Sequence, residues 1–319
     1  MKELGNARVH ILVLDDARSG QRVDNFLLRE LKGVPRSHVY RLVRSGEVRV
    51  NSRRVDVTYR LQAGDKIRIP PVRMATGGAG RPSVRPVEFP VVHEDDALLV
   101  IDKPAGVAVH GGSGVSSGVI EQLRAARPEA RFLELVHRLD RDTSGLLMVA
   151  KKRSALLAMH RALREGGVDK RYLVLVKGRW TRGSRDVTLP LRKYLTAAGE
   201  RRVSVEPGGR ESRTRFELVE RVGDYSLLAA TIETGRTHQI RVQLAELGFP
   251  VVGDEKYGDF DLNKALAKQG TRRMFLHAER LEFAHPRTGD RLALVAPLPV
   301  ELREALDRIR AIAPHAETL

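Results

Sequence analysis

Five titratable or charged residues within positions 137–142 stand directly before an apolar segment at positions 146–150, which has the pattern of a buried strand. The five are His137, Arg138, Asp140, Arg141 and Asp142. Polar side chains beside a buried strand lose hydration unless they find partners. Asp142, followed by Thr143, Ser144 and Gly145, has the composition of a turn. Asp140 has no such structural explanation, and a carboxylate there could attack a substrate covalently and leave again.

Tyr172 and Arg236 are two further candidates for chemistry. Tyr172 opens the apolar strand pattern 172–176, where its ring could stack on a nucleobase or serve as an ordinary core or cross-strand aromatic. Arg236 follows the strand pattern 225–232 and precedes a helix that Thr237 could cap. This place suits an arginine that points into a cleft; the alternative is a surface contact to phosphate.

Other chemistry finds little support in the sequence. The glycine-rich run from His110 to Gly118 lacks both the Gly-Lys-Ser/Thr ending of a phosphate loop and the spacing of a dinucleotide fingerprint. The chain has no Cys, which excludes thiolate metal sites and cysteine nucleophiles. Its ten His form no HExxH and no tight ligand cluster. We therefore expect neither a metal nor a cofactor.

The elements that would position these residues indicate an α+β body over residues 87–319. Strand and helix patterns are mixed without regular β–α alternation. The expected strands are 98–101, 145–150, 172–176, 225–232 and 274–276, and the expected helices are 118–126, 154–163, 237–247 and 300–312. The polar segment 196–213, rich in Gly and Arg, predicts a long exposed loop.

A small module precedes this body. Apolar spacing predicts a helix over 20–31 and a second over 36–44, with Gly46 at its C-terminal cap. Short strands are expected at 9–14, 47–50 and 66–69. Residues 74–86 are rich in Gly and Pro and predict a flexible linker. The domain prediction is therefore a module at 18–73, a linker at 74–86 and a body at 87–319.

Charge indicates a polyanionic partner. The chain carries a net charge of +16, and residues 18–73 hold 14 Lys or Arg against 5 acids, a net charge of +9. Basic surfaces bind nucleic acid because each neutralised phosphate releases counterions. A solvated helix face is the alternative, but the clustering favours contacts to a phosphate backbone. The candidates are Arg36, Tyr40, Arg41, Arg44, Arg53 and Arg54.

The location and assembly of the protein are less constrained by the sequence. No apolar run is long enough to span a bilayer. The lack of Cys fits a cytoplasmic protein. No exposed apolar stripe is evident, which favours a monomer.

Several segments resemble known families. The run GEVRVNSRRV at 46–55 with LQAGDKIRI at 61–69 resembles an S4 RNA-binding domain. Three further segments, HRLDRDTSG at 137–145, KRYLVLV at 170–176 and ETGRTHQIRVQ at 233–243, resemble the RluA-type family of pseudouridine synthases, as does VVGDEKYG at 251–258. The resemblance implies a catalytic domain built on a mixed, mainly antiparallel sheet.

The resemblance also implies a reaction that breaks the glycosidic bond of uridine in RNA, turns the base and rejoins its C5 to the ribose, without a cofactor. It implies that Asp140 is the nucleophile, that Arg236 is a buried arginine paired with it, and that Tyr172 stacks on the uracil and helps to remove the C5 proton. Arg138 would fill the gap left by the flipped base, His137 would support the loop, and Arg141 would contact phosphate, as would Lys151 and Lys152.

Two alternatives stay open at this point. An RNA-binding assembly factor without activity would share the charge and the S4-like module. A carboxylate hydrolase would use Asp140 and Asp142 as a pair of acids. Within the family, the run from His110 to Gly145 favours uridines of large-subunit (23S) ribosomal RNA as substrate, whereas relatives act on other ribosomal or transfer RNA sites.

Overall fold

The computed structural model describes residues 9–15, 18–31, 34–72, 84–111, 117–181, 183–197 and 199–312, without the side chains of Arg36 and Ile312. The chain divides into two compact units, Met1–Ser83 and Val84–Leu319. The boundary falls inside the predicted linker 74–86, of which positions 74–83 lie outside the described residues.

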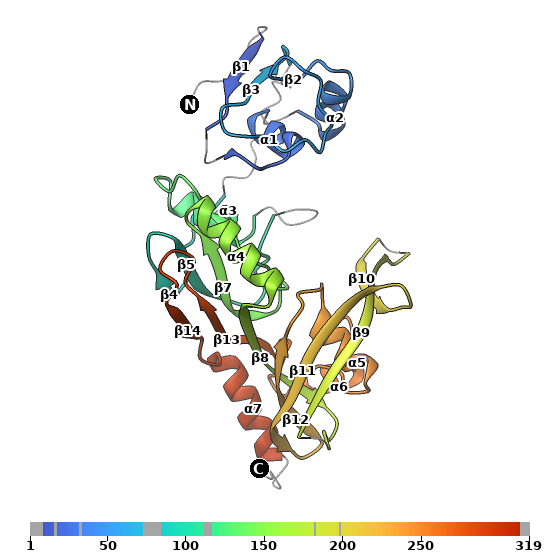
Figure 1. Ribbon diagram of the computed structural model, residues 1–319. Helices are drawn as coiled ribbons and strands as arrows, with labels where there is room; N and C mark the ends of the chain where they lie inside the picture. Colours follow the sequence, from blue (N-terminus) through green and yellow to red (C-terminus); the bar gives the residue numbers. More distant parts are fainter. Residues whose placement is uncertain are drawn as a thin grey trace. The chain divides into compact units, whose positions relative to one another are not determined.

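The first unit packs two helices against a three-stranded antiparallel sheet of order β1-β3-β2 (Figure 1). Its elements are β1 (His10–Val13), α1 (Val23–Glu30), α2 (Arg36–Arg44), β2 (Arg49–Val50) and β3 (Lys66–Ile69). Gly46 follows α2 with a φ of +76°, a conformation that glycine adopts without strain. The apolar side chains of both helices form one core with those of the sheet, including Phe26, Val39 and Ile67.

The second unit is built on an eleven-stranded mixed sheet whose main path runs β10-β9-β11-β12-β8-β13-β7-β5-β4, with β14 paired to β13 and β6 to β7. Its strands are β4 (Val91–Glu94), β5 (Leu98–Lys103), β6 (Glu134–Leu135), β7 (Ser144–Ala150), β8 (Val168–Lys177), β9 (Ser184–Leu195), β10 (Arg201–Val205), β11 (Arg210–Val222), β12 (Tyr225–Ile232), β13 (Leu276–Ala284) and β14 (Arg291–Val295). Its pairs are antiparallel except β7 with β13. The predicted α+β class and the mainly antiparallel sheet are confirmed.

The parallel contact between β7 and β13 requires glycine at position 145. Gly145 has a φ of +109° and pairs with Ala278. A Cβ atom at this position would lie 2.2 Å from the carbonyl oxygen of Ala278. Any larger residue would push the two strands apart, and β7 begins directly after the polar turn that holds Asp140.

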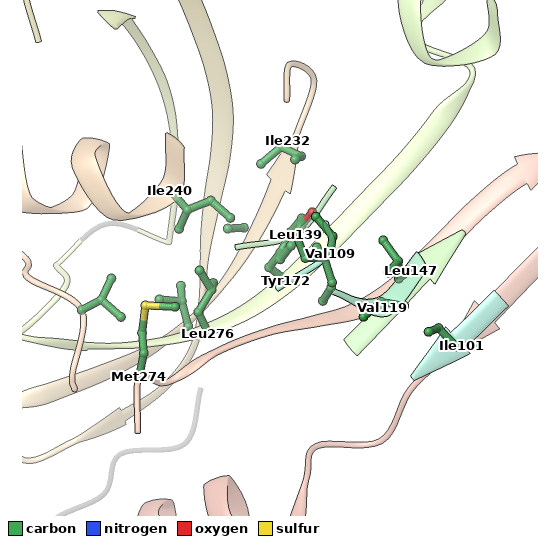
Figure 2. Packing of buried hydrophobic residues seen from close by; sticks show 14 of the residues in the cluster. Ile101, Val109, Val119, Leu139, Leu147, Tyr172, Ile232, Ile240, Met274 and Leu276 are labelled. Atoms are coloured by element: carbon green, nitrogen blue, oxygen red, sulfur yellow. The ribbon is translucent and has the colours of Figure 1, made fainter. Parts of the chain in front are cut away.

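Helices cover both faces of the sheet. They are α3 (Val119–Ala126), α4 (Arg153–Glu165), α5 (Gln239–Glu246), α6 (Phe260–Lys268) and α7 (Val300–Ile312). Alternate side chains of β5 divide between two cores: Leu99 and Ile101 pack with α3 and α5, whereas Leu98 and Val100 pack with α4. Figure 2 shows residues of the first core, to which Ile240 of α5 and Tyr172 of β8 both belong. On the face of the sheet opposite the first core, α7 packs against β8 and β12.

The predicted loop at 196–213 is wrong for half of its length. Residues 201–205 form β10 and residues 210–213 open β11, so that β9, β10 and β11 make an antiparallel arm (Figure 1). Most side chains of the arm are exposed or half-buried. Leu191 and Val203 are buried in a small cluster with Val242 of α5, against which Leu189 and Val205 also pack. The arm has no continuous apolar face, which is why its sequence resembled a loop.

None of the helices in the described ranges has the length and apolar character that crossing a membrane requires.

Candidate active site

Asp140 lies in the tight turn between β6 and β7. Its carbonyl oxygen accepts a hydrogen bond from Thr143 N at 3.3 Å. Lys103, at the end of β5, is fully buried behind this turn and donates to three backbone carbonyls, among them that of Arg141 at 3.0 Å. Burial lowers the pKa of Lys103 to about 8, and nearby carboxylates oppose that shift. The backbone on which Asp140 sits is therefore fixed from inside the fold.

His137 supports the same turn from its other end. Its Nε2 accepts a hydrogen bond from Met148 N of β7 at 3.2 Å. Burial, followed by the charge of Lys170, lowers the pKa of His137 to about 4, so the imidazole is neutral at pH 7. This contact agrees with the supporting role expected from the sequence.

The buried arginine that pairs with Asp140 is Arg241 of α5. Its Nη1 donates to Asp140 Oδ2 at 3.0 Å, and its Nε and Nη2 each donate to Asp254 at 2.7 Å. The side chain of Arg241 is 5% exposed, that of Asp254 0% and that of Asp140 16%. Burial opposes its charge, but the hydrogen bonds and charges of the two carboxylates outweigh burial and raise the pKa of Arg241. The guanidinium thus clamps one oxygen of Asp140.

The predicted pairing of Arg236 with Asp140 is wrong. Arg236 is exposed, and its Nε donates to the carbonyl oxygen of Glu211 at 3.1 Å. It lies in the turn before α5, whereas position 241 lies within the helix, on its buried side. Arg236 nevertheless lines the same small cavity as Asp140.

The sequence carried a signal for Arg241 that the prediction did not use. Arg241 stands directly between the apolar residues Ile240 and Val242. Every residue from 239 to 244 is buried, which a helix with one solvated face would not produce. A buried arginine needs a buried acid, and Asp254 follows the apolar pair Val251–Val252.

Asp140 and Tyr172 line one small cavity of about 70 Å³, together with Arg236 and Arg241. Tyr172 is 7% exposed and lines this cavity together with Leu139, the residue that precedes Asp140. Burial, with the charge of Asp140 adding to it, raises the pKa of Tyr172. The cavity therefore offers one carboxylate, one neutral phenol and one clamped guanidinium, enough for covalent chemistry on a planar ring.

His238 lies on the other side of Asp140 and was not predicted as a site residue. It precedes α5 with a φ of +55°, and its Nε2 is 3.9 Å from Asp140 Oδ1. Its Nδ1 is 2.8 Å from the hydroxyl of Tyr257. The predicted cap, Thr237, makes no side-chain hydrogen bond at this helix end, so the strained His238 occupies the capping position instead.

Asp142 faces a different cavity from Asp140. It lies in the turn, as predicted, and accepts a hydrogen bond from Arg141 Nε at 3.1 Å. Asp142 and Arg141 line a cavity of about 700 Å³ that does not include Asp140. Two carboxylates must flank the same bond to act as an acid pair. The geometry therefore does not favour the hydrolase alternative.

A wide basic groove of about 1070 Å³ adjoins the small cavity and shares Arg138, Thr237 and His238 with it. The arm contributes Lys193, Tyr194 and several further residues. The cations of the groove are Arg138, Lys193, Arg201, Arg202 and Lys256, and no acidic residue lines it. Within the described part of the chain, the first three of these cations have no carboxylate partner. Arg138, a predicted RNA contact, stands at the junction.

The predicted RNA contacts of the first unit lie on α2 and on the turn after β2. Arg41, Arg44, Arg53 and Arg54 are exposed. Tyr40 is half-buried and donates to the buried Asp24 at 2.8 Å, so its hydroxyl serves the core of the unit. The guanidinium of Arg44 lies 5.9 Å from the centre of the Tyr40 ring. The side chain of Arg36 lies outside the described residues.

Of the other predicted contacts, Lys151 and Lys152 pair with acids. Lys151 Nζ lies 2.7 Å from Glu94, and Lys152 Nζ lies 3.9 Å from Asp96.

Among the residues with described positions, no group of three or more His, Asp or Glu could hold a metal ion.

Two family models match the chain. The model described as RNA pseudouridylate synthase matches residues 97–246, and the S4 domain model matches residues 21–67. The first match includes Asp140, Tyr172 and Arg241, and ends before Asp254. The second covers both helices and β2 of the first unit, begins after β1 and ends within β3.

Curated relatives match nearly the whole chain. It is 50% identical over 310 residues to ribosomal large subunit pseudouridine synthase C of Salmonella typhi, covering 95% of this chain and 97% of that protein. It is 50% identical over 309 residues to the synthase of the same name from Escherichia coli strain K12, with the same coverage of both chains. The synthase of that name from Haemophilus influenzae is 49% identical over 310 residues, covering 96% of each chain.

Solved structures share the fold of the second unit. Human RNA pseudouridylate synthase domain containing 4 aligns with a TM-score of 0.58 at 23% identity, covering 69% of this chain and 93% of that one. Human RNA pseudouridylate synthase domain containing 1 aligns with a TM-score of 0.56 at 25% identity, covering 73% of this chain and 97% of that one.

Proposed function

The chain belongs to the RNA pseudouridylate synthase family, and on that basis we propose that it converts uridines of large-subunit (23S) ribosomal RNA to pseudouridine, with Asp140 as covalent nucleophile. The observation that carries this assignment is the small cavity that Asp140 shares with Tyr172, in which Arg241 holds one oxygen of the nucleophile.

The geometry around Asp140 supports a nucleophilic role. Arg241 occupies Oδ2 at 3.0 Å, so Oδ1 is the oxygen left to attack. The guanidinium is itself anchored by Asp254, which keeps it from following the nucleophile toward the substrate. The carboxylate stays oriented when a new bond forms on Oδ1.

The size of the cavity supports base flipping. A space of about 70 Å³ fits part of one base and no helical segment, so the target nucleotide would have to leave its stack to reach Asp140. Tyr172 would provide a ring for the uracil to stack on. Its raised pKa keeps the phenol protonated at neutral pH, which favours stacking over direct removal of the C5 proton by a phenolate.

The basic groove supports a path for the flanking RNA. Its cations without carboxylate partners, Arg138, Lys193 and Arg201, can each neutralise a phosphate. Arg138 would enter the gap left by the flipped base, since it lines both the groove and the cavity. The exposed arginines of the first unit, with Arg141, would add phosphate contacts that carry no sequence information by themselves.

The choice of large-subunit ribosomal RNA is supported by the relatives that match almost end to end under that name. We further propose that the protein acts as a monomer, because Asp140, Tyr172 and Arg241 of one chain already share the cavity. We also propose that it acts in the cytoplasm, which its cysteine-free sequence fits.

Purified protein and protein-free ribosomal RNA test this function. Carbodiimide-based mapping should reveal new pseudouridines in large-subunit RNA after incubation with the wild type, and none in small-subunit RNA or transfer RNA treated in parallel. Modification confined to one of those other RNAs would contradict the substrate assignment. RNA binding without conversion of any uridine would indicate an inactive assembly factor.

A further inference from the structure

His238 is the one imidazole that lines the Asp140 cavity in the described part of the chain. Arg241 holds Oδ2 of Asp140, and His238 Nε2 lies 3.9 Å from the opposite oxygen, Oδ1. This distance is too long for a hydrogen bond, so Nε2 faces the attacking oxygen without being bonded to it. The φ of +55° at His238 is uncommon for a residue with a side chain, so the fold holds this ring at a cost in strain.

Tyr257 determines which nitrogen of His238 carries the proton. The Tyr257 oxygen is 2.8 Å from His238 Nδ1 and accepts a hydrogen bond from Val203 N at 2.9 Å. Burial raises the pKa of Tyr257 to about 12, so its hydroxyl keeps its proton. The described residues offer that proton no acceptor other than Nδ1. Nδ1 is therefore the acceptor, and the imidazole proton lies on Nε2, which faces Asp140.

The imidazole is also neutral. Burial is the main cause that lowers the pKa of His238 to about 4. The charged and titratable groups that face it are Asp140 in the turn before β7, Arg241 in α5, and Asp254, Lys256 and Tyr257 in the segment before α6. The two cations lower the pKa of His238 further, and the two carboxylates oppose them.

We propose that His238 is a further catalytic residue, whose neutral Nε2–H donates to a uracil carbonyl oxygen, and that Tyr257 is the positioning residue that fixes this tautomer. The proposal rests on the proposed function. When Asp140 Oδ1 bonds to the nucleoside, the carboxylate becomes a neutral ester. The displaced electron pair moves to the uracil, either from the broken glycosidic bond or from the C5–C6 double bond.

Either route places negative charge on the oxygens of a uracil bound in the cavity that His238 lines. A fixed neutral donor stabilises charge where it develops without repelling Arg241, and it needs no reorganisation during the step. No proton leaves the imidazole, and the negative charge returns to Asp140 when the ester bond breaks. Because Val203 belongs to β10, the seating of the arm on α5 also fixes the orientation of Tyr257.

Single-turnover conversion by full-length variants tests the donor. His238→Gln keeps a neutral N–H, whereas His238→Leu removes it, and both side chains meet the same backbone strain. We expect a loss of about 100- to 1000-fold for His238→Leu and less than about tenfold for His238→Gln, with RNA affinity unchanged in both. Equal rates for the two variants would overturn the proposal.

Tyr257→Phe tests the positioning role. It keeps the ring over Arg241, where the guanidinium carbon lies 5.2 Å from the ring centre. We expect a loss of about tenfold in the presence of His238 and no further loss in the His238→Leu background, because Tyr257 acts through the imidazole. A similar loss in both backgrounds would mean that Tyr257 has only a structural role.

Nitrogen-15 NMR of the histidine side chains identifies the tautomer of His238 directly. It uses the wild-type protein without RNA, so the result depends neither on the folding of the variants nor on the proposed substrate. The expected spectrum has a protonated Nε2 and an unprotonated Nδ1 for His238, both unchanged down to about pH 5. A protonated Nδ1, or an imidazolium at neutral pH, would overturn the proposal even if the enzyme converts ribosomal RNA as expected. Failure of wild-type conversion with the expected spectrum would instead contradict the proposed substrate.

Discussion

The cavity around Asp140 and the groove beside it use charge in opposite ways. In the cavity, Arg241 is buried and bonded to two carboxylates, and it cannot move without leaving charges unpaired. In the groove, Lys193 and Arg201 are exposed, and no carboxylate among the described residues pairs with them. A group that orients a nucleophile must be held in place, whereas a group that grips phosphates must be free to meet them. Charge alone therefore does not distinguish the two roles; burial and partners do.

Of the substitutions that distinguish the cavity from the groove, the one at Arg241 should have the largest effect on stability and activity. Arg241→Ala leaves the fully buried Asp254 without its partner, and the loss of one member of a buried pair costs about 3–5 kcal/mol. Activity should fall by more than about 100-fold, because Asp140 also loses its orientation. Arg236→Ala, five positions away and exposed, should change unfolding by less than about 0.5 kcal/mol.

Denaturation followed by fluorescence of Trp180, the single tryptophan and a buried one, reports on the second unit alone. Equal destabilisation by the two arginine variants would remove the distinction between a clamped and a free cation.

His137 should make the free energy of unfolding depend on pH, by an amount similar to the loss in Arg241→Ala. Its pKa is about 4 in the folded protein and near 6.5 in an unfolded chain. Between these values the unfolded chain binds more protons, so stability is present above pH 6.5 and is lost as the pH falls toward 4. The loss should reach about 3 kcal/mol.

His137→Gln cannot titrate and keeps an oxygen that can accept from Met148 N, so its unfolding should depend less on pH in this window. His238 contributes with the same sign and remains in that variant. A pH profile identical to that of the wild type would show that His137 is not held neutral.

Tyr172 tests whether the ring or the hydroxyl matters in the cavity. Stacking of a base on an aromatic ring contributes about 1–3 kcal/mol. Tyr172→Leu should therefore lose about 10- to 100-fold in turnover, whereas Tyr172→Phe should stay within a few-fold of the wild type. Single-turnover release of tritium from [5-³H]uridine in RNA measures both. A larger loss for Tyr172→Phe than for Tyr172→Leu would assign the main role to the hydroxyl.

The smallest expected effect is on RNA binding and comes from substituting a single cation of the groove. Arg201→Ala should lower the slope of log affinity against log salt by about 1, because one phosphate contact is lost. Arg192→Ala is a matched control: it removes the same charge from the same arm, but Arg192 pairs with Glu206 at 3.2 Å and does not line the groove. If both variants lowered the slope equally, the whole arm rather than the groove would attract the RNA.

The bounds of a helix or strand were predicted best from the sequence where nearby residues mark its start and end. Helix α2 has Pro35 before it and Gly46 after it, and its observed bounds match the prediction, as do those of β3, β12 and α7. Strand β13 was expected at 274–276 but runs from Leu276 to Ala284. Its charged residues alternate with apolar ones, a pattern that only the neighbouring strands make recognisable as buried.

The site was harder to predict because its contacts are distant in sequence. Asp140 stood out among its neighbours, but its partner Arg241 lies 101 positions away. Arg236 and Arg241 both lie in the segment 233–243 that resembles the family, and only the helix that starts at Gln239 decides which of them is buried. The roles of His238 and Tyr257 depend on a hydrogen bond from β10, in the region where the sequence predicted a loop.

The most direct test of the central claim compares Asp140→Asn with Asp142→Asn in single-turnover conversion of large-subunit ribosomal RNA. Each change removes one negative charge with little change in shape, and the two residues lie two positions apart in the same turn. We expect Asp140→Asn to bind the RNA and form no pseudouridine, and Asp142→Asn to keep most of the wild-type rate. Measurable conversion by a folded Asp140→Asn protein would contradict the assignment of Asp140 as nucleophile.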